Sequence, residues 1–258
     1  MKSGVNAWIF GNLSLDKKIE KARELGFDGL ELNYGDDVQE DTHIESTNDL
    51  ALPSLCTSLF WKYPLNSPEE EVRRKGISVG ISMAKTAAKL GAKVMLVVPG
   101  VNNPSLRYEE LLALSASSLK EIGKAARDVG VKVGIENVWN KLLYSPAEYV
   151  QFIRDLGEGF GAYFDVGNVM EIGHPVQWLR ELKGMIIGVH FKDYDVQSRR
   201  FVPLLQGDVP WKEVVNLLYG YDGYAMVEQG PYKGDRYQAV IDAKAAMSTI
   251  LSYVSLGR

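Results

Sequence analysis

The chain has 258 residues, of which 46% are hydrophobic and 24% charged, as in ordinary globular proteins. Its net charge is −4, with lysine and arginine scattered along the chain, which argues against nucleic-acid binding. A single cysteine, Cys56, excludes an intrachain disulfide and a cysteine-rich zinc site. No signal-peptide core and no membrane-spanning run of about 20 apolar residues occurs, so we expect a cytoplasmic protein without a membrane partner.

Short apolar runs and longer amphipathic stretches alternate along the chain. Eight runs rich in β-branched or aromatic residues predict strands at 5–10, 29–34, 52–58, 93–98, 132–138, 162–166, 186–191 and 224–228. Helix start and stop signals predict helices at 14–26, from 66–70 onward, and at 108–129, 145–156, 175–182, 210–218 and 235–254, with a short polar helix at 41–50.

Strict alternation of strands and helices predicts a parallel sheet with helical crossovers, an α/β fold. Eight such units in one chain of this length favour closure into a single (β/α)8 TIM barrel, one domain over residues 1–258. An open doubly wound sheet would instead carry a glycine-rich phosphate loop after its first strand. The sequence there is Phe10-Gly11-Asn12-Leu13-Ser14, without that motif.

Four late strands end in residues that bind metals well: Glu136, Asp165, His190 and Glu228. The carboxyl ends of barrel strands meet at one mouth, so these side chains are expected to converge there. Three carboxylates would repel one another, and a divalent cation removes that conflict. A single acid after a strand is usually a helix cap or an ion-pair partner, but four on consecutive strands favour one divalent metal. Manganese is the first expectation, with magnesium, cobalt and zinc as alternatives.

Several stretches of the sequence are distinctive: Leu52-Pro53-Ser54-Leu55-Cys56, Tyr63-Pro64-Leu65-Asn66-Ser67, Ile135-Glu136-Asn137, Phe164-Asp165-Val166-Gly167-Asn168, His190-Phe191-Lys192-Asp193, Val202-Pro203-Leu204-Leu205-Gln206-Gly207-Asp208-Val209 and Val227-Glu228. In these stretches the sequence resembles the sugar phosphate isomerase/epimerase superfamily, the xylose isomerase-like barrels, and especially the L-ribulose-5-phosphate (L-xylulose-5-phosphate) 3-epimerases. The resemblance runs from about residue 4 to residue 250.

The resemblance implies that Glu136, Asp165, His190 and Glu228 bind one divalent metal, and that Glu136 and Glu228 are also the acid/base pair. It implies an enzyme that inverts C3 of a small ketose or ketose phosphate through a cis-enediolate. Proton transfer between C1 and C2 would instead give an aldose–ketose isomerase, and the same intermediate would also serve a keto-sugar or keto-inositol dehydratase.

Further candidates for substrate binding surround these four. Lys192 shares the face of its strand with His190 and could neutralise an enediolate or a phosphate, or be an ordinary surface lysine. Trp8 and Trp61 follow early strands and either form an apolar wall over the sugar or pack in the barrel. Glu31 either hydrogen-bonds the substrate or is a buried polar group satisfied by its neighbours.

Two departures from the family patterns bear on the substrate. Many non-phosphorylated ketose 3-epimerases have histidine and arginine where this chain has Asn168 and Val196, which favours the pentulose-phosphate branch. That branch has a basic pair where this chain has Trp61-Lys62, so Lys62 is the remaining candidate there for binding phosphate.

Two other functions agree less well with the sequence. A related DNA-repair endonuclease would need three zinc ions, many histidines and a basic groove, whereas this chain has three histidines and is acidic. A non-catalytic sugar-binding barrel would not need both glutamates. The resemblance implies a homo-oligomer, a dimer or tetramer.

Overall fold

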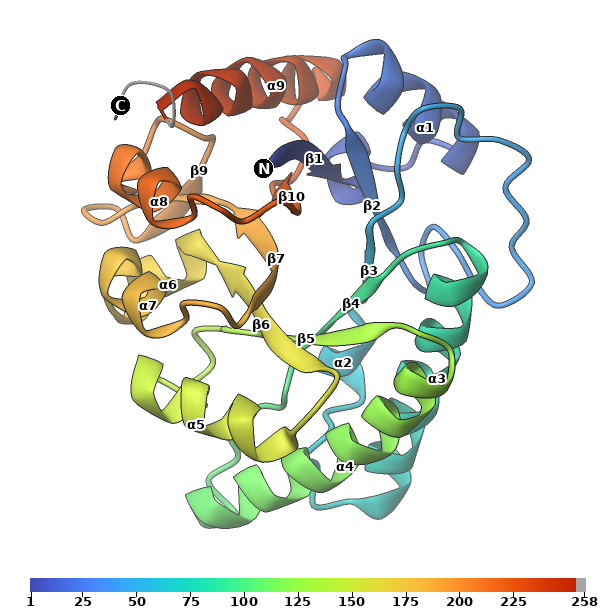
Figure 1. Cartoon of the computed structure of the whole chain (residues 1–258), viewed down its shortest axis with the longest axis vertical. Helices are drawn as coiled ribbons and strands as arrows, with labels where there is room; N and C mark the ends of the chain where they lie inside the picture. The colour runs from blue at the N-terminus through green and yellow to red at the C-terminus, as the bar shows by residue number, and fades with distance from the viewer. Residues whose placement is uncertain (254–258) are drawn as a thin grey trace.

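The computed structural model describes residues 1–253, without the side chain of Arg236, and contains a closed barrel of eight parallel strands (Figure 1). In chain order these are β1 (Lys2–Asn6), β2 (Gly29–Asn33), β3 (Ser54–Cys56), β4 (Val94–Val97), β5 (Lys132–Glu136), β6 (Phe160–Asp165), β7 (Ile186–Phe191) and β10 (Tyr224–Val227). β10 pairs with β1, which closes the ring, and Val5 lies opposite Val227. The single (β/α)8 TIM barrel is confirmed.

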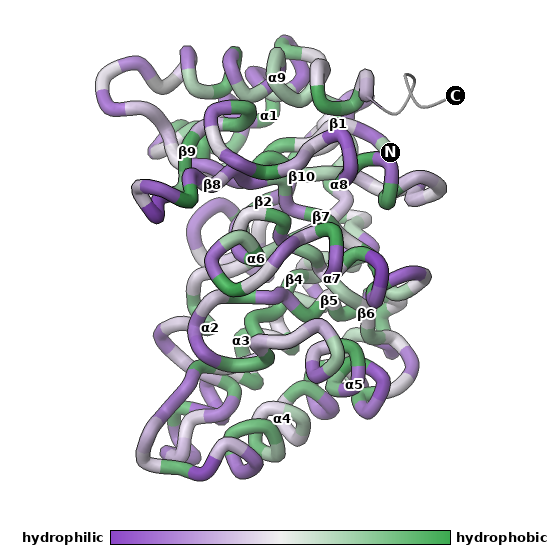
Figure 2. The backbone as a smooth tube through the Cα atoms, turned by 90° about the vertical axis from the view of Figure 1, so that its left-hand side faces the viewer, coloured by the Kyte–Doolittle hydropathy of each residue, from purple (hydrophilic) through white to green (hydrophobic). Residues whose placement is uncertain are grey.

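Helices surround the ring of strands (Figure 1). The longer ones are α1 (Leu15–Glu24), α3 (Glu70–Lys89), α4 (Tyr108–Asp128), α5 (Pro146–Leu156) and α9 (Arg236–Ser252), and α7 (Pro175–Glu181) and α8 (Trp211–Leu217) are shorter. Hydrophobic and hydrophilic residues alternate along α4 and α5 (Figure 2), as expected for helices with one face on the barrel. No helix within residues 1–253 is long and apolar enough to cross a membrane.

Local signals explain where helices begin and end. At α5, the Ser145 hydroxyl accepts a hydrogen bond from the Glu148 backbone N–H at 3.2 Å, and Pro146 occupies the first turn. The same helix ends at Gly157, whose φ of 89° lies in the region that favours glycine. The helix expected at 145–156 is therefore confirmed, since α5 begins and ends at these signals.

The structure corrects several details. The helix expected at 41–50 is wrong, because this segment is a loop with no helical turn. The first strand ends at Asn6, where the Asn6 side chain accepts a hydrogen bond from the Trp8 N–H and starts a 3-10 helix, η1 (Ala7–Phe10). Val254, the expected end of the last helix, lies outside the described residues.

Three short additions were not expected. They are α2 (Leu59–Lys62), α6 (Val166–Ile172) and a two-stranded hairpin of β8 (Asp193–Asp195) and β9 (Arg200–Val202). The hairpin begins two residues after β7 at the same mouth, and its turn is strongly hydrophilic (Figure 2). The buried Asp193 carboxylate accepts hydrogen bonds from the backbone N–H groups of Tyr194, Leu205 and Val209 and from the Trp211 indole, which anchors this insertion.

Candidate active site

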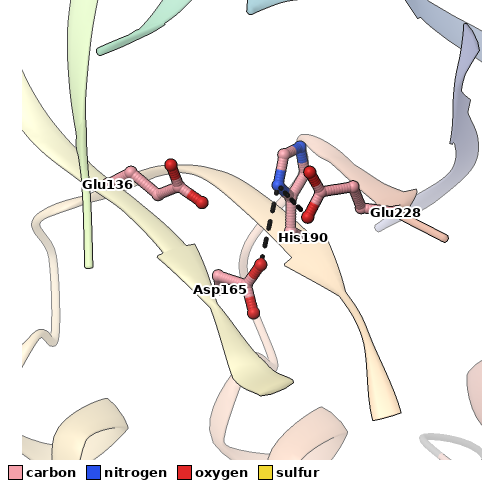
Figure 3. A group of neighbouring side chains, drawn as sticks. All are labelled: Glu136, Asp165, His190 and Glu228. Carbon is pink, nitrogen blue, oxygen red and sulfur yellow. Dashed lines mark ion pairs between the residues drawn. The ribbon is translucent and has the colours of Figure 1, made fainter. Parts of the chain in front are cut away.

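Four neighbouring strands of the barrel, β5, β6, β7 and β10, bring the four expected ligands together. Glu136 and Asp165 are the last residues of β5 and β6, His190 lies opposite Asp165 on β7, and Glu228 directly follows β10. One ligand atom from each residue lies within 4.8 Å of the others. Figure 3 shows Glu136 and Glu228 on opposite sides of this group, with Asp165 and His190 between them. This geometry could hold one metal ion.

Buried polar atoms provide a direct test of that fit. Asp165 Oδ2, His190 Nδ1 and Glu228 Oε2 are buried and have no partner of good hydrogen-bond geometry, and the two oxygens share the single ammonium group of Lys192. His190 Nδ1 lies 3.8 Å from Asp165 Oδ2 and 3.5 Å from Glu228 Oε2 (Figure 3). Three buried carboxyl groups beside one lysine are costly, and a divalent cation satisfies such a group of oxygens and an imidazole nitrogen. The residues present therefore fit a divalent metal.

Lys192 supplies the positive charge nearest to these ligands. Its ammonium nitrogen lies 3.1 Å from Asp165 Oδ2 and contacts Glu228 Oε2, and its side chain is largely buried. Burial lowers the pKa of Lys192, but Asp165 and Glu228 raise it more, so the group stays charged. The ammonium also lies 4.8 Å from the centre of the Phe201 ring in the hairpin.

The two glutamates have very different proton affinities. Burial, followed by the negative charges of Glu228 and Asp165, raises the pKa of Glu136 to about 8. Burial also opposes ionisation of Glu228, but the positive charges of Lys192 and His190 outweigh it and lower the pKa of that carboxyl. At neutral pH, in the absence of metal, Glu136 therefore keeps a proton while Glu228 is ionised.

Two asparagines hold the carboxylates in place. The Asn168 backbone N–H donates to Asp165 Oδ1 at 2.7 Å, and its side-chain amide donates to Glu136 Oε1 at 3.2 Å. Asn137 exchanges two hydrogen bonds with the backbone of Asp165, through its amide nitrogen at 2.8 Å and its carbonyl oxygen at 2.9 Å. Asn168 thus lies beside the ligands and orients two of them.

A cleft of about 900 Å³ opens above this group at the carboxyl ends of the strands. Glu136, His190 and Glu228 line it together with Trp8 and Trp61. The two indoles are about half exposed, at 53% and 50%. The Trp8 ring lies against Gly230, where an added Cβ would come within 3.1 Å of the indole.

The comparisons with known proteins agree with this architecture. Residues 19–249 match the family model described as "Xylose isomerase-like TIM barrel". The chain belongs to this family.

Relatives within the family include enzymes that act on ketoses. L-ribulose-5-phosphate 3-epimerase UlaE of Salmonella heidelberg is 25% identical over 229 residues, covering 82% of this chain and 81% of that protein. A D-tagatose 3-epimerase-like protein superposes with a TM-score of 0.83 at 24% identity, covering 99% of both chains. The IOLI protein with a zinc atom has a TM-score of 0.82 at 22% identity, covering 98% of both chains. The two structures show the shared fold.

The secondary candidates fall into two groups. Lys192, Asn168, Trp8 and Trp61 lie at or beside the cleft. Lys62 is exposed and does not line it; its ammonium lies 5.2 Å from the centre of the Tyr63 ring.

Glu31 lies inside the barrel against His190, one of the four expected ligands, and is completely buried. Its carboxylate accepts hydrogen bonds from protein groups, which agrees with a buried polar group satisfied by its neighbours.

Several residues at the site were not singled out from the sequence: Asn6, Ser54, Asn137 and Tyr163. Tyr163 could have been found, because it lies two residues before Asp165 on the same strand and therefore faces the same side. The roles of Asn6 and Ser54 depend on contacts between strands far apart in the chain, 25 and 23 residues from Glu31, and no local pattern indicates them.

Proposed function

We propose that this protein is a divalent-metal-dependent epimerase that inverts C3 of a small ketose or ketose phosphate. Glu136, Asp165, His190 and Glu228 bind the metal, and Glu136 and Glu228 also transfer the protons. The observation that carries the proposal is the group of four inward-facing ligands, whose ligand atoms all lie within 4.8 Å of one another. The kinship to a 3-epimerase and the zinc atom in a structural relative support it.

The placement of the two glutamates explains how C3 could be inverted. When bound, the divalent ion supplies a Lewis acid that polarises the sugar carbonyl. Glu136 and Glu228 face the centre of the site from opposite sides (Figure 3), so each reaches one face of a flat sugar carbon between them. One carboxylate removes the C3 proton, and the other carboxyl group returns a proton to the opposite face. A pair of acids on one side would return the proton to the face that lost it.

The other groups have supporting roles in this proposal. Lys192 is the cation nearest to Asp165 and Glu228 and stabilises negative charge that develops on the sugar oxygens. Asn168 donates a hydrogen bond to each of Glu136 and Asp165 and so holds both carboxyl groups in place. Trp8 and Trp61 form the apolar wall of the cleft. Manganese is the proposed metal, since the set has three carboxylates and one imidazole, and magnesium, cobalt and zinc remain alternatives.

Within the described residues, no second group of three or more histidine, cysteine, aspartate or glutamate ligands occurs. A centre of three zinc ions, as in the related DNA-repair endonucleases, therefore has no counterpart in residues 1–253. This supports a single-metal sugar enzyme over the endonuclease alternative.

Proton exchange in D2O tests the reaction. The manganese-loaded protein is incubated with a panel of pentuloses, hexuloses and their terminal phosphates, and the products are analysed by NMR. We expect deuterium at C3 together with the C3 epimer for at least one ketose. Exchange at C1 with none at C3 would contradict the epimerase and identify an aldose–ketose isomerase, and loss of water would identify a dehydratase.

A further inference from the structure

Below the metal ligands, a second carboxylate contacts the histidine from the opposite side. His190 has its Nδ1 turned toward Asp165 and Glu228, while its Nε2 lies 2.6 Å from Glu31 Oε2. Both Glu31 and the imidazole are buried, at 0% and 1% exposure. The two ring nitrogens therefore have separate partners. Nδ1 faces Asp165 and Glu228 in the proposed metal site, and Nε2 faces Glu31 behind it.

The Glu31 carboxylate is saturated with protein donors. Tyr163 donates its hydroxyl to Oε1 at 2.5 Å and Ser54 donates to the same oxygen at 2.7 Å. Asn6 donates its side-chain amide to Oε2 at 2.8 Å, beside the His190 contact. A carboxylate offers about four acceptor positions, so none is left for a sugar hydroxyl. Glu31 therefore acts on the site only through His190.

The Tyr163 side chain reaches Glu31 because two glycines make room for it. Tyr163 belongs to β6, and its ring passes through the barrel to β2. A Cβ on Gly134 would lie 2.9 Å from the tyrosine Cβ, and one on Gly188 would lie 2.4 Å from its ring. The ring also packs edge-on against His190, with 4.8 Å between the ring centres. The barrel interior is thus shaped to hold this tyrosine against both partners.

We propose that Glu31, fixed by Tyr163, Ser54 and Asn6, is a positioning residue that prepares His190 to bind the metal. It accepts the Nε2 proton of the neutral imidazole, which leaves the Nδ1 lone pair directed at the ion and restricts rotation of the ring. Its negative charge also makes the imidazole a stronger ligand. This inference rests on the metal site of the proposed function and assigns Glu31 a role toward the metal rather than the sugar.

A purely structural role is the competing explanation, and the chain offers a matched control. Asp193 is another carboxylate with 0% exposure, and it too accepts hydrogen bonds from four protein donors. None of its donors is a metal-ligand candidate. Removing the charge from Asp193 should disturb the fold about as much as removing it from Glu31, while the hydrogen bond between Glu31 and His190 Nε2 stays in place.

Cobalt binding tests the proposal without relying on turnover. Metal-free wild-type protein and the variants Glu31→Gln, Tyr163→Phe and Asp193→Asn are titrated with Co²⁺ by calorimetry, and the visible absorption of the bound ion is recorded. Circular dichroism checks that each variant is folded. We expect Glu31→Gln to weaken Co²⁺ binding by about 10–100-fold and to change the absorption bands. Tyr163→Phe should have a smaller effect of the same kind, since two donors to Glu31 remain besides His190.

The outcomes distinguish a failure of the positioning role of Glu31 from a failure of the proposed epimerase function. Wild-type affinity and spectrum in Glu31→Gln, or in Tyr163→Phe should the first variant not fold, would overturn the positioning role. An equal loss in Asp193→Asn would also overturn it, by showing a general structural effect. Wild-type protein that binds Co²⁺ in the expected way but converts no ketose would contradict the proposed function and leave the role of Glu31 intact.

Discussion

At the scale of single residues, the carboxyl groups of the site carry negative charge that one bound cation would neutralise. Glu136, Asp165 and Glu228 bring three carboxyl groups into a space that also contains His190. Without metal, Lys192 offsets part of the repulsion, and Glu136 keeps a proton. A divalent ion would replace both of these compensations at once. In the proposed function, metal binding therefore displaces a proton from Glu136.

Exchanging Glu136 or Glu228 for glutamine tests which of the two removes the C3 proton and which returns one. Each variant should lose about 10²–10⁴-fold in the rate of epimerisation, because general acid–base catalysis contributes factors of that size. With one epimer as substrate, the variant that keeps the proton-removing glutamate should still exchange the C3 proton with D2O without inverting the centre. NMR of both epimers measures this. Equal epimerisation by wild type and either variant would exclude that glutamate from proton transfer.

The dependence of metal binding on pH follows from the raised pKa of Glu136. Below about pH 8 this carboxyl is protonated in the metal-free protein, so the metal must displace a proton. Burial lowers the pKa of His190, but the charges of Glu31 and Glu228 raise it more, so this ligand also gives up a proton to the metal. Affinity should therefore rise with pH, by at least about tenfold per unit below pH 8. Calorimetric titrations with Mn²⁺ from about pH 6 to about pH 9, a range that spans that pKa, measure the slope. In Glu136→Gln the slope should be shallower; an unchanged slope would show that other groups release the proton.

At the scale of elements, the site depends on short segments at the carboxyl mouth. The 3-10 helix η1 places Trp8 on the wall of the cleft, and α2 places Trp61 there. The β8–β9 hairpin brings Phe201 over the Lys192 ammonium. These segments are too short to produce a periodic pattern, which explains why the sequence did not predict them. The helix expected at 41–50 is absent because this polar segment is rich in Asp, Thr, Ser and Asn, which favour turns, and has no apolar stripe to bury.

Substituting Trp8 by alanine tests the proposed wall. We expect the KM for the ketose to rise about 2–10-fold with little change in kcat, since aromatic contacts contribute about 0.5–1.5 kcal/mol beyond burial. Trp139 is a suitable control, because it is also about half exposed but does not line the cleft. Steady-state kinetics of Trp8→Ala and Trp139→Ala provide the measurement. A similar KM in Trp8→Ala and wild type would remove this tryptophan from the substrate site.

At the scale of the whole molecule, closure of the barrel is what brings distant residues together. Alternating apolar runs and caps were enough to predict eight strands and most outer helices. The convergence of the four candidate ligands could be predicted because each lies at the end of an apolar strand. The residues that hold His190 from behind could not be predicted from the sequence. Glu31 and Tyr163 meet across the barrel, 132 residues apart in the chain, and only the closed sheet places them in contact.

Metal binding should stabilise the whole barrel, because the ligands come from four strands that separate on unfolding. At a free Mn²⁺ concentration about 100 times the Kd, the free energy of unfolding should rise by about 2.7 kcal/mol. Thermal melts with Mn²⁺ and with a chelator measure the difference. Asp165→Asn, which weakens a ligand at the centre of the group, should show a smaller shift. A Tm that is the same with metal and chelator would argue against a site formed by these strands.

Anomalous diffraction from crystals of the Mn²⁺-loaded protein tests the central claim most directly. The account predicts one strong peak per chain at the carboxyl mouth of the barrel, within bonding distance of Glu136, Asp165, Glu228 and His190 Nδ1. A peak bound by other residues, or no peak among these four in protein shown to be saturated with Mn²⁺, would contradict it.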